Sequence, residues 1–306
     1  MIKRTLYFGN PAYLSLKMKQ LVIKLASKSN ENQANEKDDI LTIPIEDIGV
    51  LILDNKQITL TQGLMEELLE NNCAIVTCDS RRMPVGLLLP LAGNSIQNER
   101  FRHQISASLP LKKQLWQQTI EAKIYNQAKV LQYSSGEEHK NMLIWSDSVK
   151  SGDSENMEAR AAVYYWKTIF PDKPDFIRGR EEEAPNALLN YGYAILRAVV
   201  ARALVGNGLL PTLGIHHHNR YNAYCLADDI MEPYRPYVDK VIVDLLNESE
   251  IPELNSNIKA KLLNIPVIEV VINGRRSPLM LAVSQTTSSL VKCFRGESKK
   301  LIYPKM

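Results

Sequence analysis

The sequence lacks the features that define several large classes of protein. Its four cysteines are spaced too widely and irregularly for a disulfide framework, which favours a reducing cytoplasm. Fourteen glycines and fifteen prolines are too few for a fibrous or low-complexity chain. We find no run of about 18 uncharged apolar residues, so we expect no membrane-spanning helix. The N-terminus also lacks the apolar core and cleavage site of a secretion signal.

Several catalytic motifs are missing as well. The sequence contains no G-x-x-x-x-G-K-[ST], no G-x-G-x-x-G and no G-x-S-x-G. These absences remove the main sequence support for ATP hydrolysis, dinucleotide chemistry and α/β-hydrolase chemistry. No cysteine joins the histidines and carboxylates at metal-ligand spacing, which argues against a structural zinc site.

What is present is the composition of a globular protein. The chain has 306 residues, 45% of them hydrophobic and 23% charged, a length that suggests about two domains. The net charge of +3 is uneven, because residues 1–95 carry −1 and the remainder carries +4. The last fifteen residues alone carry +4, and such a tail can follow a phosphate backbone. Charge alone favours a solvated, frayed terminus instead.

The hydrophobic pattern predicts an α+β fold, a small N-terminal β-sheet domain followed by a larger all-α C-terminal domain. We expect residues 1–90 to form the strand domain, 91–99 a linker, and 100–306 a helical catalytic domain with a late hairpin near 265–283. Expected strands lie at 5–8, 14–25, 40–45, 48–53, 74–78 and 85–89, with a helix at 60–69. Expected later helices lie at 101–132 (broken at Pro110), 155–170, 184–205, 236–246 and 285–294.

Two segments have an unusual composition. Residues 27–39 contain no large apolar residue and are predicted to be an exposed loop. Residues 184–205 are nearly all apolar but include Asn190, Arg197 and Arg202. We therefore expect the buried central helix of a bundle and not a membrane span.

The densest polar cluster is His216-His217-His218, followed by Asp228, Asp229 and Glu232. Asp229 and Glu232 are three residues apart, which places both carboxylates on one helix face while Asp228 points elsewhere. Pro233 predicts a helix end or kink at that pair. A histidine with two carboxylates suits a divalent metal ion, although carboxylates on a solvated helix surface are commonplace. Glu158, in the first turn of its helix, is a second candidate for a functional carboxylate. A favourable interaction with the helix dipole is the simpler explanation for a glutamate at that position.

The combination of these segments resembles a known family, the CRISPR-associated integrase Cas1. The residues that carry the resemblance are LGIHHHNRYNAYCLADDIMEPYRPYVDK (213–240), MEARAAVYYW (157–166) and NALLNYGYAIL (186–196). The DIMEPYRP form is most similar to the type II systems. The resemblance covers the whole chain, including the CDSRRMPVGLLLP segment at its strand-rich front.

The resemblance implies a fold, a site and a reaction. Metal-binding residues of the family map onto Glu158, His217 and Glu232, with Asp229 as a further acidic catalytic residue; His216 and His218 occupy positions that vary. The implied cofactor is Mg²⁺ or Mn²⁺. The implied reaction joins protospacer DNA 3′-hydroxyls to the CRISPR repeat by transesterification, without ATP. Implied partners are double-stranded DNA, a second copy of the chain and a small Cas2 dimer that bridges two homodimers; participation of the effector nuclease stays open.

The sequence leaves two other functions open, of which only the first uses the same residues. A metal-dependent, structure-specific nuclease would hydrolyse branched DNA or RNA, with water in place of the 3′-hydroxyl. A non-catalytic scaffold would bind nucleic acid through the basic tail and the helical surface and form no metal-dependent product.

Overall fold

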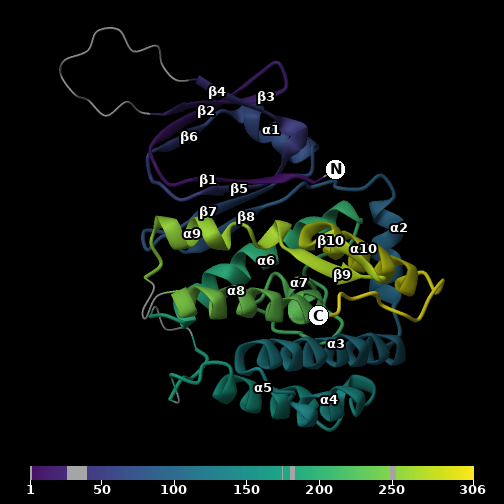
Figure 1. Ribbon diagram of the computed structural model, residues 1–306. Coiled ribbons are helices and arrows are strands. Elements are labelled where there is room, and N and C mark those ends of the chain that lie inside the picture. The colour runs from purple at the N-terminus through teal and green to yellow at the C-terminus, as the bar shows by residue number, and fades with distance from the viewer. Residues whose placement is uncertain (1, 26–39, 174, 180–182, 249–252) are drawn as a thin grey trace. The chain divides into compact units, whose positions relative to one another are not determined.

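A computed structural model describes residues 2–25, 40–173, 175–179, 183–248 and 253–306. The chain divides into two compact units, Met1–Gly93 and Asn94–Met306. The division falls within the segment 91–99 that we expected to be a linker. A strand-rich first unit and a mostly helical second unit (Figure 1) confirm the predicted α+β class. The predicted loop at 27–39 lies outside the described residues.

The first unit contains two four-stranded sheets. One has the order β1 (Arg4–Phe8), β5 (Ile48–Leu53), β7 (Ala74–Cys78) and β8 (Pro84–Leu88). Its first three strands are parallel, and β8 is antiparallel to β7. The other sheet has the order β4 (Ile40–Pro44), β3 (Gln20–Leu25), β2 (Ala12–Lys17) and β6 (Ile58–Leu60). We did not predict β6, because a three-residue strand is too short for alternation to be visible in the sequence.

One hydrophobic core joins the two sheets of the first unit. Leu14 and Leu21 from one sheet, and Ile48 and Leu51 from the other, are fully buried in it. Helix α1 (Gln62–Glu70) adds Leu64 and Leu68, four residues apart on its inner face. Strand β5 is almost continuously buried, as expected for a central parallel strand with an apolar sequence.

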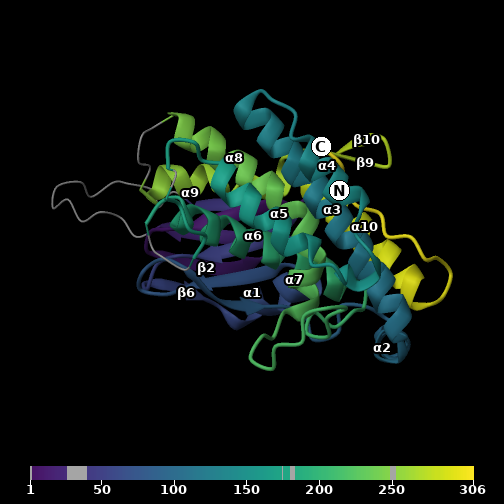
Figure 2. The same ribbon diagram turned by 90° about the horizontal axis from the view of Figure 1, so that it is seen from below.

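The second unit is mostly helical. Its helices are α2 (Gln97–Ser106), α3 (Leu109–Ser135), α4 (Lys140–Asp147), α5 (Met157–Thr168), α6 (Asn186–Gly206), α7 (Cys225–Met231), α8 (Arg235–Glu248), α9 (Ser256–Leu262) and α10 (Leu279–Phe294). The hairpin strands are β9 (Glu269–Ile272) and β10 (Arg275–Pro278). Figures 1 and 2 show α4 and α5 running beside the long helix α3. We did not predict α4 and α9, whose eight and seven residues leave little room for a periodic pattern, and we expected α7 only as a helical turn ending at Pro233.

Helix α3 begins at Leu109, one residue before the proline that we expected to interrupt a helix. Ser108 caps its N-terminus, accepting a hydrogen bond from the Leu111 N–H at 3.4 Å, and Pro110 lies in the first turn. Proline is tolerated there because the first turn has no intrahelical partner for its missing N–H. The chain therefore separates α2 from α3 just before Pro110 and then continues unbroken for 27 residues.

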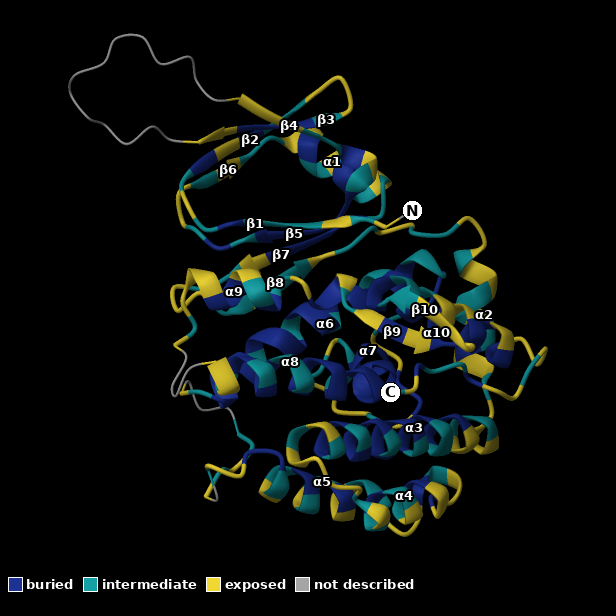
Figure 3. Cartoon of the chain, in the orientation of Figure 1, coloured by how far each residue is buried: buried dark blue, intermediate teal, exposed yellow. Residues whose placement is uncertain are grey.

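Helix α6 is the buried centre of the second unit. Figure 3 shows it almost entirely in the colour of buried residues. Among the described residues it is the one helix long and apolar enough to cross a membrane, but 78% of that stretch is buried within the protein. Gly192 permits close packing, because a Cβ atom there would lie 2.6 Å from Val238 of α8. These observations match the predicted buried helix.

Two details differ from the sequence prediction. Asn273 and Gly274 form the predicted hairpin turn, but the second apolar run begins α10 at Leu279, so the hairpin is shorter than 265–283. The apolar pattern of 155–170 also predicts that Val163 packs inward, but its side chain is exposed. Ala161 and Tyr165 form the buried face of α5 instead. In each case tertiary contacts decided the outcome.

The basic C-terminal tail is docked and not frayed. Leu301 is buried, and its N–H donates to Gln118 of α3 at 2.8 Å. Asn126, also on α3, donates to the Pro304 carbonyl at 3.1 Å and accepts from the Met306 N–H at 3.1 Å. The apolar and backbone groups of the tail therefore anchor it, and its lysines at 299 and 300 are exposed.

Candidate active site

The first part of the candidate site is a loop wrapped around a buried carboxylate. Asp229, on α7, is completely buried and accepts hydrogen bonds from the backbone N–H groups of Ile215, His216 and His217 at 2.7–3.2 Å. Gly214 makes this possible, because a Cβ atom there would lie 2.4 Å from the His217 carbonyl and 2.7 Å from Asp229 Oδ2. Backbone donors thus compensate the buried charge of Asp229 and hold the histidine loop against α7.

His217 is oriented by the same carboxylate. Its Nδ1 lies 2.5 Å from Asp229 Oδ1, and its ring meets the edge of Trp116 with centroids 5.6 Å apart. The hydrogen bond to Asp229 raises the pKa of His217, against the opposing effect of partial burial. With Nδ1 engaged, Nε2 is the ring nitrogen left to act on a ligand, an arrangement typical of metal-binding histidines.

The second part of the site is a pair of glutamates joined by a lysine. Glu158 lies in the first turn of α5, and Glu232 lies in the 3₁₀ turn Glu232–Tyr234 between α7 and α8. Lys123 of α3 places its Nζ 2.6 Å from Glu158 Oε1 and 2.6 Å from Glu232 Oε2. Arg235 contacts the other oxygen of Glu232 at 3.0 Å. Helices remote in sequence therefore bring the two glutamates to one ammonium group.

Local structure explains how each glutamate is positioned. The Asp153 carboxylate accepts hydrogen bonds from the backbone N–H groups of Met157 and Glu158 at 2.8 and 3.0 Å, which fixes the start of α5. Pro233 ends α7 and turns the chain through Glu232 into α8, as the sequence predicted. Both carboxylates consequently come from helix ends, where the backbone is held by neighbouring groups.

Burial and opposite charge compete at this pair. Burial alone would raise the pKa of Glu232, but the Arg235 and Lys123 cations lower it below its usual range. Burial alone would lower the pKa of Lys123, but the Glu232 and Glu158 carboxylates raise it. The pair is therefore ionised and internally neutralised, the usual condition for charges inside a protein.

The four predicted site residues lie in one cluster. Glu158 and Glu232 share Lys123, and both carboxylates contribute to the raised pKa of His217, which Asp229 binds. Asp228 points elsewhere, as predicted, and pairs with Arg197 at 2.7 Å. His216 stacks in parallel on Trp116, with ring centroids 4.1 Å apart, and the residue is exposed, as is His218. Of the three histidines, His217 alone is hydrogen-bonded through its ring to Asp229.

Sequence reasoning missed Lys123. It lies on the buried face of α3, seven residues after Trp116 and three after Ile120, and its side chain is 11% exposed. A lysine in the apolar stripe of an amphipathic helix was the available signal, because a buried lysine requires an acidic partner.

The donor chemistry of the cluster fits a divalent cation. Glu158 and Glu232 would supply oxygens and His217 its Nε2, a set suited to Mg²⁺ or Mn²⁺. In the described part of the chain, however, no three carboxylate, histidine or cysteine side chains stand in a ready metal-binding arrangement. The Lys123 ammonium supplies the positive charge between the glutamates instead.

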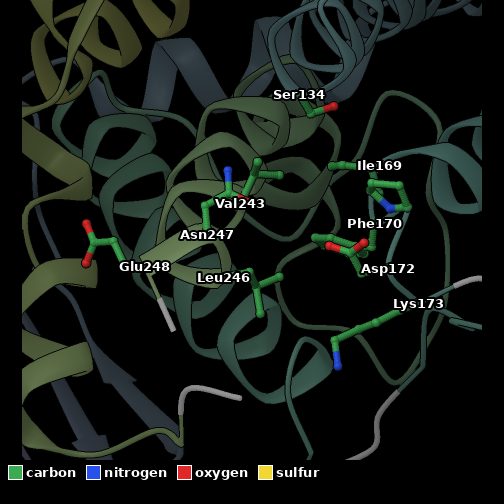
Figure 4. Close-up of a pocket in the computed structure, with 10 residues that line it drawn as sticks. Ser134, Ile169, Phe170, Asp172, Lys173, Val243, Leu246, Asn247 and Glu248 are labelled. Carbon is green, nitrogen blue, oxygen red and sulfur yellow. The ribbon is translucent and has the colours of Figure 1, made fainter. Parts of the chain in front are cut away.

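Two cavities differ in their relation to this cluster. One of about 420 Å³ opens beside His217 and is lined by polar and basic side chains that include Lys112, Asn219 and Arg220. Another, of about 510 Å³, lies at the ends of α3, α5 and α8 (Figure 4) and includes none of the predicted site residues. Of these two cavities, only the first is lined by a predicted site residue, His217.

Comparisons with known proteins agree with the resemblance. The sequence profile of the family described as "CRISPR associated protein Cas1" matches residues 6–265. The chain belongs to the Cas1 family. It is 36% identical over 288 residues to the CRISPR-associated endonuclease Cas1 of Neisseria meningitidis. The aligned region covers 94% of this chain and 90% of that protein. The chain is 29% identical over 248 residues to a Cas1 endonuclease of Saccharolobus solfataricus, and this alignment covers 77% of this chain and 72% of that protein.

Solved structures share the Cas1 fold. A casposase bound to an integration product superposes with a TM-score of 0.77 at 21% identity, covering 98% of this chain and 92% of that one. A Cas1 protein from Thermotoga maritima superposes with a TM-score of 0.71 at 17% identity, covering 96% of this chain and 97% of that one. A chain of a Cas6-RT-Cas1–Cas2 complex superposes with a TM-score of 0.74 at 17% identity, covering 98% of this chain and 36% of that one. At these identities the likeness concerns the fold alone.

Proposed function

We propose that this Cas1 protein is a metal-dependent DNA integrase that joins the 3′-hydroxyl of protospacer DNA to a phosphodiester of the CRISPR repeat. The observation that carries the proposal is that Lys123 joins Glu158 to Glu232, and that the charges of both glutamates reach the Asp229-bound His217. Membership in a family whose relatives are named endonucleases supports chemistry on phosphodiesters.

The reaction balances without an energy source. The attacking 3′-hydroxyl loses its proton and forms a new bond to phosphorus as the bond from phosphorus to the original 3′-oxygen breaks. The departing strand takes up a proton and becomes a free 3′-hydroxyl. One phosphodiester replaces another, which agrees with the missing P-loop motif.

Each residue of the cluster has a role in this proposal. Glu158, Glu232 and His217 would hold Mg²⁺ or Mn²⁺, which when bound supplies charge stabilisation at the phosphate. Asp229 positions the His217 ring through Nδ1, so that Nε2 is presented in a fixed orientation. Basic residues such as the half-buried Lys112 and the exposed Arg220, at the cavity beside His217, would follow the DNA backbone.

The partners are part of the same proposal. Double-stranded DNA is the substrate, and the chain would act as a homodimer, with a Cas2 dimer bridging two such dimers. Related folds occur in a Cas1–DNA complex and in complexes that contain Cas2. Association with the effector nuclease and a cytoplasmic location are consistent with action on a CRISPR array and stay predictions.

A strand-transfer assay tests the function. The chain, Cas2, a labelled duplex with free 3′-hydroxyls and a plasmid carrying the repeat are mixed with Mg²⁺ or Mn²⁺. We expect label in the plasmid with the wild type and at least about a hundredfold less with Glu158→Gln or His217→Ala. Glu155→Gln, an exposed glutamate three residues before Glu158, is the matched control and should retain activity.

The assay also separates the alternatives. Shortened fragments without joined product, insensitive to blocked 3′ ends, would indicate the structure-specific nuclease that the names of the relatives also permit. DNA binding without any metal-dependent product, unchanged in the site variants, would indicate a scaffold.

A further inference from the structure

Lys123 occupies an unusual place in the candidate site. It projects from the middle of α3, is almost fully buried, and contacts both glutamates that the proposed function assigns to the metal. A buried ammonium that touches two carboxylates at 2.6 Å each is a bridging cation.

The charges around the glutamates already balance. Glu158 and Glu232 carry two negative charges, and Lys123 and Arg235, which contact them, carry two positive charges. Asp229 is not a member of this ion-paired set, because His217 and backbone N–H groups occupy its oxygens. The acidic pair is thus stable without a divalent ion, and such an ion would add positive charge at a centre that is neutral.

A divalent cation that used these carboxylates would meet the ammonium directly. Lys123 is the less constrained of the two cations, because a lysine has a flexible stem and a single point charge. Arg235 is held by its stacking over Tyr193, with its guanidinium 4.9 Å from the ring centroid. Displacement would therefore fall on Lys123.

We propose that Lys123 is a built-in competitor of the divalent cation, which holds the two glutamates together when no metal is bound and must leave at least one of them when metal binds. The inference rests on the proposed metal site. Lys123 is a positioning residue in this scheme, and it makes the metal affinity of the protein weaker than its ligand set alone would give.

The test measures metal binding and not activity. Mn²⁺ is titrated into the full chain, and free Mn²⁺ is followed by electron paramagnetic resonance for the wild type, Lys123→Met and Lys123→Gln. We expect both variants to bind Mn²⁺ more tightly by about tenfold or more, because a like charge in direct contact has been removed. Lys123→Gln keeps an N–H donor for a carboxylate, so it serves if Lys123→Met does not fold.

Two controls isolate the position of the charge. Lys129→Met removes a lysine from the same helix that contacts Gln132 and the Tyr125 ring instead of the glutamates, and should leave Mn²⁺ affinity unchanged. Glu232→Gln should abolish tight binding. Mn²⁺ should also raise the midpoint of thermal unfolding more in Lys123→Gln than in the wild type, because it replaces a lost cation.

The outcomes separate this inference from the proposed function. Equal or weaker Mn²⁺ binding in the Lys123 variants, with Glu232→Gln still abolishing it, overturns the competitor and leaves the metal site intact. Binding that is absent from every variant, or unaffected by Glu232→Gln, overturns the metal site and the inference with it.

Discussion

At the residue scale, the site depends on backbone groups that surround Asp229. Three consecutive N–H groups and the His217 ring donate to its two oxygens. Both oxygens of Asp229 are thus engaged, which supports the proposed role of this carboxylate in positioning His217. The arrangement depends on Gly214, which leaves room for the loop to close on the carboxylate.

Gly214→Ala should therefore disrupt the site. The added methyl group would overlap the His217 carbonyl and Asp229 Oδ2, so the loop must shift and His217 must move with it. We expect strand transfer to fall by about tenfold or more and the free energy of unfolding by about 1–3 kcal/mol. The strand-transfer assay and urea denaturation measure the two effects.

Gly63→Ala is the matched control. Gly63 lies in α1, and a Cβ atom there would meet no atom within 4 Å. This variant should keep its activity and become slightly more stable, by up to about 1 kcal/mol. Full activity in Gly214→Ala would contradict the role assigned to the loop.

At the scale of elements, three helices meet at a buried acid. The Tyr165 hydroxyl of α5 and the Tyr193 hydroxyl of α6 donate to Asp239 of α8, at 2.8 and 2.5 Å. Burial raises the pKa of Asp239 to about 6, against the opposing effect of these hydrogen bonds. The stabilising effect of the neutral carboxyl is fully present below its unfolded pKa of 3.8 and is lost as pH rises through about 6.

Asp239→Asn should remove that pH dependence. The amide is neutral at every pH, so the stability of the variant relative to the wild type should improve by about 1 kcal/mol between pH 5 and pH 7. Urea denaturation at a series of pH values measures the difference. Asp244→Asn, a more exposed position on the same helix, controls for the general loss of one charge. A constant difference between Asp239→Asn and the wild type would refute the assignment.

The C-terminal tail is a structural element although it forms no helix or strand. Leu301→Ala should lower the free energy of unfolding by about 2–5 kcal/mol, because a buried side chain is replaced by a cavity. Lys299→Ala, two residues earlier and exposed, should change it by less than about 0.5 kcal/mol. Thermal and chemical denaturation measure both variants. If Leu301→Ala were as stable as Lys299→Ala, the tail would not be docked in solution.

At the scale of the whole molecule, positive charge is concentrated in the second unit. Residues 1–95 carry −1, the remainder carries +4, and the docked tail leaves its lysines at 299 and 300 exposed. Basic residues on this unit are therefore the expected contacts for DNA phosphates.

The salt dependence of DNA binding tests this distribution. Replacing Lys299 and Lys300 together by glutamine should weaken duplex binding and reduce the slope of log affinity against log salt by about 2, one for each lost phosphate contact. Lys56→Gln in the first unit is the control and should leave the slope unchanged. An unaltered slope in the double variant would place the DNA path elsewhere on the second unit.

Much of this protein was determined by its sequence alone. Apolar runs and alternation predicted most strands, and 3.6-residue periodicity predicted the long helices, because these patterns are local. The order of Glu158, His217, Asp229 and Glu232 within specific segments indicated the family. Three-residue spacing and Pro233 also separated Asp228 from Asp229, because neighbours on a helix face different directions.

The tertiary structure alone decided what surrounds these residues. Lys123 is 35 residues from Glu158 and more than 100 from Glu232, and no local pattern can indicate that its ammonium bridges them. The same holds for the docking of the tail on α3, where buried Leu301 and the Asn126 amide outweigh a charge pattern that favoured a frayed end. Local backbone preference sets the elements, whereas ion pairs and burial depend on which side chains the completed fold brings into contact.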